Sequence, residues 1–461
     1  MKPFKLTRRL ETLSPAQALI FYYGAAIVTG ALLLATPLAA NGIPLSFLDA
    51  LFTATSAQCV TGLIVVDTGT RFTLFGQTVV LLLIQIGGLG IMTFSVYLFL
   101  YLRVGISTRG RGIIHETLLH TPVSSWQDLI KGIILLTLII EGIGAVLLAF
   151  AFIPVLGLRQ GIYSALFHSV SAFCNAGFSL FSDNLVAFRG NALVNITVMV
   201  LIILGGIGFL VIRELFDFSR GRVRKGVGKR ARISLHSKLV LVVSAFLIVY
   251  GAVLIGWLEK TNALAGMTFL EGFWTALFQS VTARTAGFNT IDLNAFRAPT
   301  LFLIIFLMFI GASPGSAGGG VKTTSLALFF AVFYSRLRGN PNTSIFRRTI
   351  PEEIVAKAFS LVLLAIILIG IALFGLMIVQ SPDWANENPR EFLGYTFEAF
   401  SAFGTVGLSI GATAQLNSLG KWIIILLMFV GRVGLLTMAF AIAGRTRRYA
   451  ARYAEENVMI G

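Results

Sequence analysis

The chain has 461 residues, of which 56% are hydrophobic and only 12% are charged, and its mean hydropathy is +0.86. Soluble domains carry about 25% charged residues, so the composition excludes a soluble protein and indicates a polytopic membrane protein. The net charge of +16 follows from membrane topology and requires no nucleic-acid partner. The two cysteines, Cys59 and Cys174, predict neither a disulfide framework nor a metal site.

Eight apolar runs near or above the roughly 20 residues of a membrane-spanning helix follow one another along the chain. They cover residues 17–39, 74–101, 129–156, 192–212, 239–258, 300–310 continued by 324–334, 354–380 and 420–443. The first run is too long for the apolar region of a cleaved signal peptide. The sequence therefore predicts eight spans.

Lys and Arg are concentrated in alternate connecting segments. Of the 36 basic residues, 26 lie at the two chain ends and in the segments near 103–131, 213–238 and 336–357. Because basic segments stay on the cytoplasmic side, we expect both termini in the cytoplasm, as an even number of spans requires. The basic stretch 219–234 also suits contact with anionic lipid.

Four segments share one pattern: a Phe, small and hydroxyl residues, then a tripeptide that ends in Gly and precedes Leu or Phe. They are residues 52–67, 167–183, 278–293 and 397–412. The shared glycines are Gly62, Gly177, Gly287 and Gly407, and a second glycine motif follows each after 24 to 28 residues. These second motifs are "IGGLG" (86–90), "LGGIG" (204–208), "IGASPG" (310–315) and "VGRVG" (430–434).

We interpret each repeat as an apolar helix (M1), a short half-membrane helix (P), a glycine turn and a second apolar helix (M2). The P segments cover about 46–58, 161–173, 268–281 and 391–403, and they are too short to span a membrane. Re-entrant helices of this kind need shielding by protein or contact with water. The repeat predicts four units, over residues 1–128, 129–237, 238–353 and 354–461.

A glycine turn at the tip of a half-helix suits cation permeation. A bare cation in hydrocarbon is very unfavourable, and inward-facing backbone carbonyls replace its water shell. Such a backbone needs glycine, and the negative ends of the half-helices favour cations. The tripeptides contain no acidic residue, which favours a weakly hydrated monovalent ion over calcium. The candidate ion-binding residues are Val60, Thr61, Gly62, Asn175, Ala176, Gly177, Thr285, Ala286, Gly287, Thr405, Val406 and Gly407.

The chain as a whole resembles the Trk/Ktr/HKT superfamily of potassium transporters, whose members fuse four M1-P-M2 units. The resemblance is carried by "SAQCVTGL", "NAGF", "ARTAGFNT", "GTVGLS", "GASPGSAGGGVKT" and "GRVGLLT". It implies an all-α polytopic membrane protein with eight membrane helices and four re-entrant pore helices around a pseudo-fourfold pore. It also implies potassium at the four tripeptides. The early first M1 and the tail 452–461 look like those of bacterial Ktr-type pore subunits.

This resemblance further implies potassium uptake across a bacterial cytoplasmic membrane, without enzymatic activity and without a covalent cofactor. A homodimer is implied, regulated by a cytoplasmic RCK-type subunit that alone binds nucleotide, and membrane lipids are the other partner. The family often requires sodium as an activator, although no separate sodium site is evident. A sodium-permeable or weakly selective transporter is the alternative. Relatives with Ser in place of the first filter Gly tend that way, so Gly62 favours potassium.

The third M2 is interrupted by the glycine-rich segment "GASPGSAGGGVKTT" (311–324), which no regular helix would contain. We expect residues 311–323 to form an intramembrane loop that gates the pore, as the family resemblance also implies; a passive kink is the alternative. The candidate gate residues are Gly311, Ser313, Pro314, Gly315, Ser316, Gly318, Gly319, Gly320, Lys322 and Arg432.

Two enzyme motifs overlap this loop. Residues 311–315 fit the GxSxG nucleophile pattern, but Pro314 and the following glycines oppose the required helix, and no His/Asp partners are evident. Residues 315–324 look like a phosphate loop, but Val321 breaks the GK[ST] sequence. An intramembrane hydrolase is therefore the less favoured reading.

Four charged residues lie inside membrane segments, where charge requires partners. Arg432 is expected to bond loop carbonyls and hydroxyls such as those of Ser313 and Ser316. Lys322 either reaches the cytoplasmic vestibule or pairs locally. Arg284 either pairs with Glu398 or Asp292, or snorkels outward. Glu141 and the two cysteines are expected to be structural.

Overall fold

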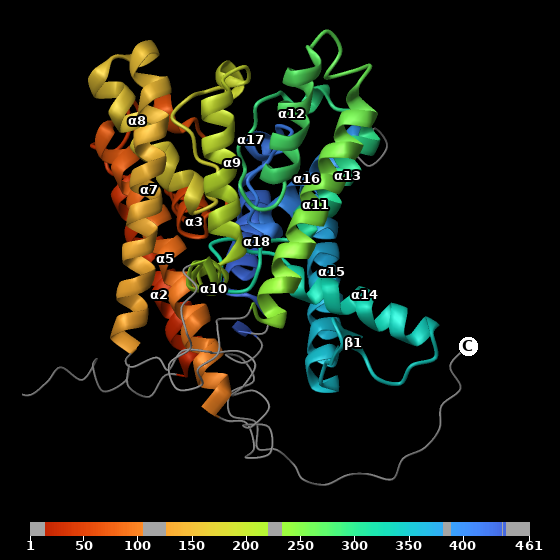
Figure 1. The fold of residues 1–461 in the computed structure, drawn as a ribbon. Coiled ribbons are helices and arrows are strands. Elements are labelled where there is room, and N and C mark those ends of the chain that lie inside the picture. The colour runs from red at the N-terminus through yellow and green to blue at the C-terminus, as the bar shows by residue number, and fades with distance from the viewer. Residues whose placement is uncertain (1–13, 105–125, 220–232, 381–388, 436, 439–461) are drawn as a thin grey trace, which may run out of the picture.

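The computed structural model describes residues 14–104, 126–219, 233–380, 389–435 and 437–438. Within these residues the regular secondary structure is helical except for one two-stranded hairpin, and the M1-P-M2 order occurs four times (Figure 1). The predicted basic chain ends and most of the basic stretch 219–234 lie outside the described residues.

The M1 and P helices follow the predicted pattern closely. The M1 helices are α2 (Pro15–Leu34), α7 (Trp126–Leu156), α11 (Leu235–Glu259) and α15 (Glu352–Gln380). The half-helices are α3 (Phe47–Gln58), α8 (Leu158–Phe173), α12 (Phe269–Thr282) and α16 (Pro389–Gly404). α3 and α12 begin at the N-cap hydroxyls of Ser46 and Thr268, which accept from the third helical N–H group. α2 is shorter than the predicted span, because Pro37 disfavours helical geometry at Thr36.

The M2 helices differ more from the prediction. The second elements are α5 (Leu74–Val104), α9 (Ala192–Ile207) with α10 (Phe209–Ser219), α13 (Ala298–Phe309) with α14 (Thr323–Leu337), and α18 (Ser418–Val433). Five helices among the described residues are long and apolar enough to span a membrane on their own, and the α9–α10 pair gives a sixth if it counts as one.

The predicted run 192–212 is not one continuous helix. The axis bends by 102° between α9 and α10, at Gly208 with φ +91°. α18 likewise ends before Gly434, whose φ is +89°. Both glycines adopt a left-handed backbone that ends a regular helix. The remainder of the predicted run 420–443 extends beyond the described residues.

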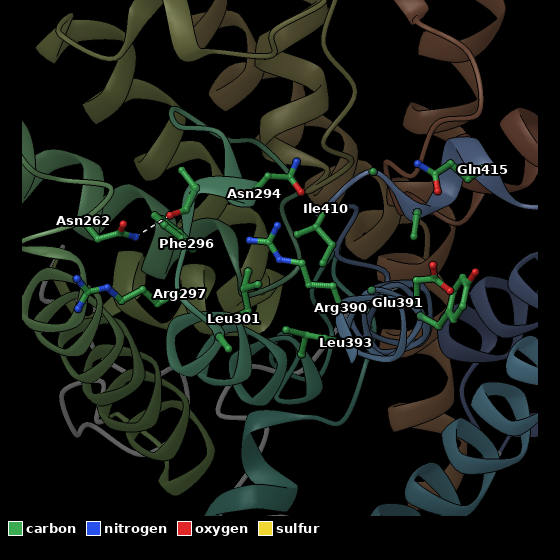
Figure 2. A pocket seen from close by; sticks show the side chains of 16 residues that line it. Asn262, Asn294, Phe296, Arg297, Leu301, Arg390, Glu391, Leu393, Ile410 and Gln415 are labelled. Carbon is green, nitrogen blue, oxygen red and sulfur yellow. Dashed lines mark hydrogen bonds between the residues drawn. The ribbon is translucent and has the colours of Figure 1, made fainter. Parts of the chain in front are cut away.

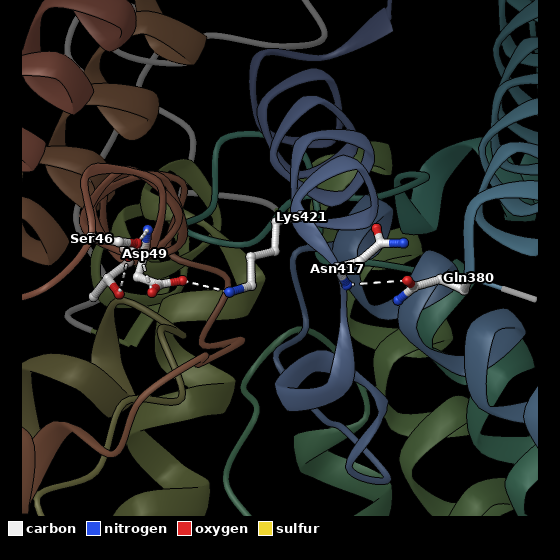
Figure 3. Close-up of polar contacts among 6 residues, drawn as sticks. Ser46, Asp49, Gln380, Asn417 and Lys421 are labelled. Atoms are coloured by element: carbon white, nitrogen blue, oxygen red, sulfur yellow. Dashed lines mark hydrogen bonds and ion pairs between the residues drawn. The ribbon is translucent and has the colours of Figure 1, made fainter.

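The four repeats close into a ring. α5 contacts the half-helix α8 of the next repeat, α9 contacts α12, α13 contacts α16, and α18 returns to α3. At this last junction Lys421 on α18 forms an ion pair of 2.6 Å with Asp49 in the first turn of α3 (Figure 3). The first and last repeats are therefore neighbours.

Short elements connect these helices. They are α4 (Thr68–Arg71), η1 (Val186–Phe188), η2 (Leu293–Ala295), α17 (Ala412–Gln415), β1 (Ser344–Ile345) and β2 (Arg348–Thr349). The antiparallel hairpin β1–β2 follows α14, which extends sideways from the helix bundle (Figure 1). Large apolar side chains on the outward faces of the M1 helices are exposed, such as those of Leu135 and Val249. Such faces match a lipid environment.

Candidate functional site

The four repeat glycines lie next to one another. A methyl group at Gly177 would lie 2.7 Å from the carbonyl oxygen of Ala286, and one at Gly287 would lie 2.5 Å from that of Val406. Methyl groups at Gly62 and Gly407 would collide with the carbonyls of Ala176 and Thr61. Each glycine therefore faces the carbonyl that precedes the glycine of the next repeat, and the fourth faces the first. We call this arrangement the glycine ring.

All four tripeptides share an unusual backbone. Their glycines have φ between +69° and +92°. The residue two positions earlier also has positive φ in every repeat: 55° at Val60, 61° at Asn175, 77° at Thr285 and 48° at Thr405. Asn tolerates this region, but the three β-branched residues are strained by roughly 1–3 kcal/mol each. Such strain persists only where the surroundings impose it, and it is concentrated at functional sites.

The N–H groups of the tripeptides bond back to their own half-helices. In repeat 1, Thr61 N–H donates to the Ser56 carbonyl (2.7 Å) and Gly62 N–H to the Ser56 hydroxyl (3.1 Å). In repeat 4, Val406 and Gly407 make the same two bonds to Ser401, at 2.8 and 3.1 Å. Because the N–H groups are engaged behind the turn, the carbonyl groups of these turns remain available to a ligand at the ring.

Repeat 3 departs from this geometry. Gly287 follows Phe278 after nine residues, whereas the corresponding distance in the other repeats is ten. Ala286 N–H consequently donates to Thr282 four positions earlier (2.9 Å), rather than to a residue five positions earlier. Gly287 still lies in the ring, so the turn compensates for the missing residue by this change in hydrogen bonding.

A cavity of about 410 Å³ opens on one side of the glycine ring, and all four glycines line it. Its wall also carries three carboxylates, Asp67, Asp183 and Asp292. Sequence reasoning missed their role, although an Asp follows the glycine by five or six positions in three of the four repeats. We call this space the acidic cavity. Its charge attracts cations toward the ring.

The glycine-rich segment of the third M2 lies against the other end of the tripeptides. Gly319 N–H donates to the Thr405 hydroxyl (3.1 Å), and a side chain at Gly318 would collide with the Thr285 hydroxyl. The loop closes at its base by pairing between Ile310 and Val321. The predicted loop is therefore present, and it contacts the candidate ion-binding residues directly.

Repeat 2 holds this loop through the break in its M2. Ser313 and Ala317 donate their N–H groups to the carbonyls of Gly206 and Gly205, both at 3.0 Å. In return, Phe209 N–H at the start of α10 donates to the Gly315 carbonyl (3.2 Å). Because the bend frees these backbone groups from helical bonding, the loop satisfies them.

Repeats 1 and 4 hold the loop through Arg432. Its guanidinium donates to the Ala317 carbonyl in the loop and to the Gly87 carbonyl of α5, the latter at 2.9 Å. The expected loop carbonyl is thus a partner, but the Ser313 and Ser316 hydroxyls bond elsewhere. The loop is therefore bonded directly to the M2 glycine motifs of repeats 2 and 4, and Arg432 links it to that of repeat 1.

Lys322 pairs locally, one of the two alternatives drawn from the sequence. Its ammonium donates to the carbonyls of Gly318 (2.8 Å) and Gly319 (3.4 Å). It also lines a second cavity, of about 360 Å³, together with Arg432, His236 and loop residues including Pro314 and Gly320. We call this space the basic cavity. Among the described residues, no carboxylate lines it.

Glycines of the M2 motifs pack on the ends of the half-helices. Side chains at Gly87, Gly205 and Gly431 would collide with the carbonyls of Gln58, Phe173 and Phe403 respectively, each four positions before a ring glycine. In three repeats these glycines therefore permit close packing of M2 against the half-helix. Gly311, their counterpart in repeat 3, faces Gly319 of the loop instead.

The expectation for Arg284 was wrong. Its guanidinium is buried and donates to the carbonyl (3.3 Å) and hydroxyl (3.1 Å) of Ser244 on α11. Glu398 instead accepts from the Ser409 and Thr413 hydroxyls, and Asp292 caps η2. Both carboxylates therefore bond other groups, and α11 supplies Arg284 with a neutral acceptor.

Glu141 is buried and accepts from the Gln85 amide on α5 (3.1 Å). Its other carboxylate oxygen lies 3.7 Å from the Cys174 sulfur. Cys59 and Cys174 are both buried free thiols. These contacts fit the expected structural roles, because they join α7 to α5 and to the end of α8.

A third cavity, of about 450 Å³, lies between repeats 3 and 4 and is lined by no ring glycine. Figure 2 shows Arg390 extending into it toward Phe296 and Ile410, whereas Arg297 lies at its edge. This cavity is separate from the ring and from the loop.

Ser313 lacks the surroundings of a nucleophile. Its hydroxyl lies 3.0 Å from the Thr323 hydroxyl, and the segment before it is the helix α13 rather than a strand. A nucleophilic serine needs an adjacent base. The GxSxG pattern is therefore a coincidence of the glycine-rich loop.

Comparison with known proteins gives a consistent result. Residues 10–446 match the TrkH family, described as cation transport protein. The chain is 40% identical to Ktr system potassium uptake protein B of Bacillus subtilis over 450 residues, which are 97% of each chain. It is 37% identical to potassium/sodium uptake protein NtpJ of Enterococcus hirae over 455 residues, 98% of each.

A solved structure is also similar. The potassium transporter TrkH from Vibrio parahaemolyticus superimposes with a TM-score of 0.73 at 19% identity, over 93% of this chain and 85% of that one. At this identity the similarity supports the fold alone. The all-helical membrane fold of this chain, with several apolar spans and a re-entrant-like bent pair, matches that structure overall.

Proposed function

Because this chain belongs to the TrkH family of cation transport proteins, we propose that it takes up potassium through a filter formed by the glycine ring. The family is one of multi-pass membrane transporters, so the predictions of a membrane protein and of no enzymatic activity are confirmed. The curated relative with 40% identity is a Ktr system potassium uptake protein, which supports potassium as the substrate.

The closed glycine ring is the observation that carries the proposal. Eight spans and four half-helices form a pseudo-fourfold pore, with units 1–128, 129–237, 238–353 and 354–461. The carbonyls of the four tripeptides replace the water shell of potassium, while the acidic cavity concentrates cations beside them. No carboxylate belongs to a tripeptide, as suits a monovalent ion.

The loop 311–323 is the gate in this proposal. It lies between the acidic and basic cavities and is bonded to the hydroxyl of a filter residue at Thr405. Its glycines and Pro314 exclude a regular helix, and Arg432 holds it in the pore. Opening then requires the loop to leave Arg432 and the glycine motif of α9.

Topology and assembly complete the proposal. Both termini lie in the cytoplasm of a bacterial cell, the acidic cavity faces outward and the basic cavity inward. In this proposal the pore works as a homodimer with a cytoplasmic partner that binds nucleotide; the name of the 40% identical relative, a Ktr system protein, supports a partner protein. A potassium/sodium uptake protein is 37% identical, so weak selectivity with sodium permeation is the second candidate.

Uptake by a potassium-transport-deficient bacterium that expresses the chain tests the function. We expect growth at low potassium, and we expect Gly407→Ser to reduce potassium uptake relative to sodium. Equal potassium and sodium uptake by the parent chain would favour the second candidate. An absence of cation uptake by a properly inserted parent chain would refute both.

Deletion of residues 315–320 and Arg432→Ala test the gate in the same cells. Both are expected to raise potassium flux and weaken its regulation, because the obstruction or its anchor is removed. Lys238→Ala, which removes an exposed charge from α11, is the control. The gate hypothesis fails if the deletion and Arg432→Ala both leave flux and regulation as in the parent.

A further inference from the structure

Two adjacent tyrosines of α2 contact consecutive carbonyls of α5. Tyr22 donates its hydroxyl to the Ile86 carbonyl (3.2 Å), and Tyr23 donates to the Gly87 carbonyl (2.8 Å). The two differ in burial: Tyr22 is 41% exposed, whereas Tyr23 is fully buried. A buried phenol without a hydrogen-bond partner is unfavourable, so the Gly87 carbonyl is a required partner of Tyr23.

The Gly87 carbonyl is also the acceptor of the gate arginine. Arg432 donates one guanidinium nitrogen to it at 2.9 Å and the other to Ala317 in the loop. One oxygen atom is therefore shared by Tyr23 and Arg432. The bonds run without a gap from α2 through α5 to α18 and the loop.

Arg432 depends strongly on these bonds. It is 3% exposed, no carboxylate lies among its hydrogen-bond partners in the described part of the chain, and its Nε has no partner there. A buried charge with few acceptors is sensitive to the position of each one. Gly87 sits directly on the end of α3, where a side chain would collide with the Gln58 carbonyl, so the close packing of α5 on α3 places its carbonyl beside Arg432.

We propose that Tyr23 is a positioning residue of the gate: its hydroxyl holds the Gly87 carbonyl where Arg432 needs it to keep the loop in the pore. The inference rests on the proposed function, and it makes the first M1 helix part of the closed state. Displacement of α2 relative to α5 removes this support and releases the loop. Tyr22, one residue away, has no such role, because Ile86 is not an acceptor of Arg432.

A double-mutant cycle tests the inference. Rubidium uptake is measured in proteoliposomes of the purified full chain, for Tyr23→Phe, Arg432→Ala and the pair, with Tyr22→Phe as the matched control. Tyr23→Phe keeps the ring and removes only the hydroxyl. We expect it to raise uptake through the closed gate by roughly two- to tenfold, the effect of one lost hydrogen bond.

The decisive result is the coupling. In the Arg432→Ala background, and equally in the chain lacking residues 315–320, Tyr23→Phe should change uptake no further, whereas Tyr22→Phe should have little effect in any background. If Tyr23→Phe acts equally in all backgrounds, or if it matches Tyr22→Phe, the inference is wrong. Selective uptake by the parent chain would then still support the proposed function, whereas an inactive parent chain would refute both.

Discussion

The acidic and basic cavities lie on opposite sides of the four tripeptides and the loop 311–323, and they carry opposite charge. Asp67, Asp183 and Asp292 line the first, and Lys322 and Arg432 line the second. A cation is attracted into one and repelled from the other. In the proposed function this difference makes the gate electrostatic as well as steric, because the loop also brings the positive charge of Lys322 to the basic cavity.

The largest expected effect on uptake comes from a substitution in the glycine ring, which lies between the two cavities. Gly407→Ala should lower potassium uptake roughly 100-fold, because a strain of about 1–3 kcal/mol at φ +88° adds to collision with the Thr61 carbonyl. Gly411→Ala is the control: its φ is +97°, but no neighbouring atom lies within 4 Å. Similar losses in the two variants would show that strain alone, and not the ring, decides uptake.

Removal of the negative charges should have the next largest effect. The triple variant Asp67→Asn, Asp183→Asn and Asp292→Asn is expected to slow uptake about tenfold at low potassium and low ionic strength. Asn retains the capping bonds of Asp67 and Asp292. Uptake rates at increasing ionic strength check the cause, since screening should shrink the difference. Glu391→Gln, an exposed change outside this cavity, should not reproduce it.

Neutralisation on the other side should have a smaller, opposite effect. Lys322→Gln is expected to raise outward potassium flux roughly fivefold, because a unit charge leaves the basic cavity while an amide N–H still reaches the loop carbonyls. Efflux from loaded proteoliposomes measures it, with Lys238→Gln as the surface control. Unchanged efflux would mean that the loop acts by size alone.

The smallest effect is expected outside both cavities. Asp49→Asn breaks the ion pair with Lys421, whose partners are 24% and 19% exposed. A pair this accessible contributes about 0–1 kcal/mol. The midpoint of thermal unfolding should therefore fall only slightly, with uptake retained. A large loss of uptake would show that the junction between the first and last repeats shapes the filter.

The sequence predicted the elements whose signal is local. The half-helices end three to five residues before the repeated glycines. The loop in the third M2 was evident because Pro314 and five neighbouring glycines exclude a helix. The break at Gly208 was not predicted. Its motif has the same glycines as the one in α5, which stays helical. The difference arises from the loop, whose backbone bonds replace those that α9 loses.

The sequence also did not predict two pairs of hydrogen-bond partners that lie far apart along the chain. The contact of Arg284 with Ser244 joins residues 40 positions apart, and that of Arg432 with Gly87 joins residues 345 apart. Neither acceptor is charged, so the pattern of charges in the sequence does not predict either contact. The three Asp residues did carry a signal, because they recur after the ring glycines, but recurrence in only three of four repeats concealed it.

The loop 311–323 occurs in one repeat, yet it bonds to the glycine motifs of repeats 2 and 4 and is linked through Arg432 to that of repeat 1. An obstruction on the axis of a ring must be single, because four identical copies would compete for the same volume. In a pore assembled from four identical subunits, every subunit carries the same loop, so a single subunit cannot supply the obstruction alone. Fusion of unequal repeats into one polypeptide removes this restriction, and the inequality of the repeats becomes the property that makes an axial gate feasible.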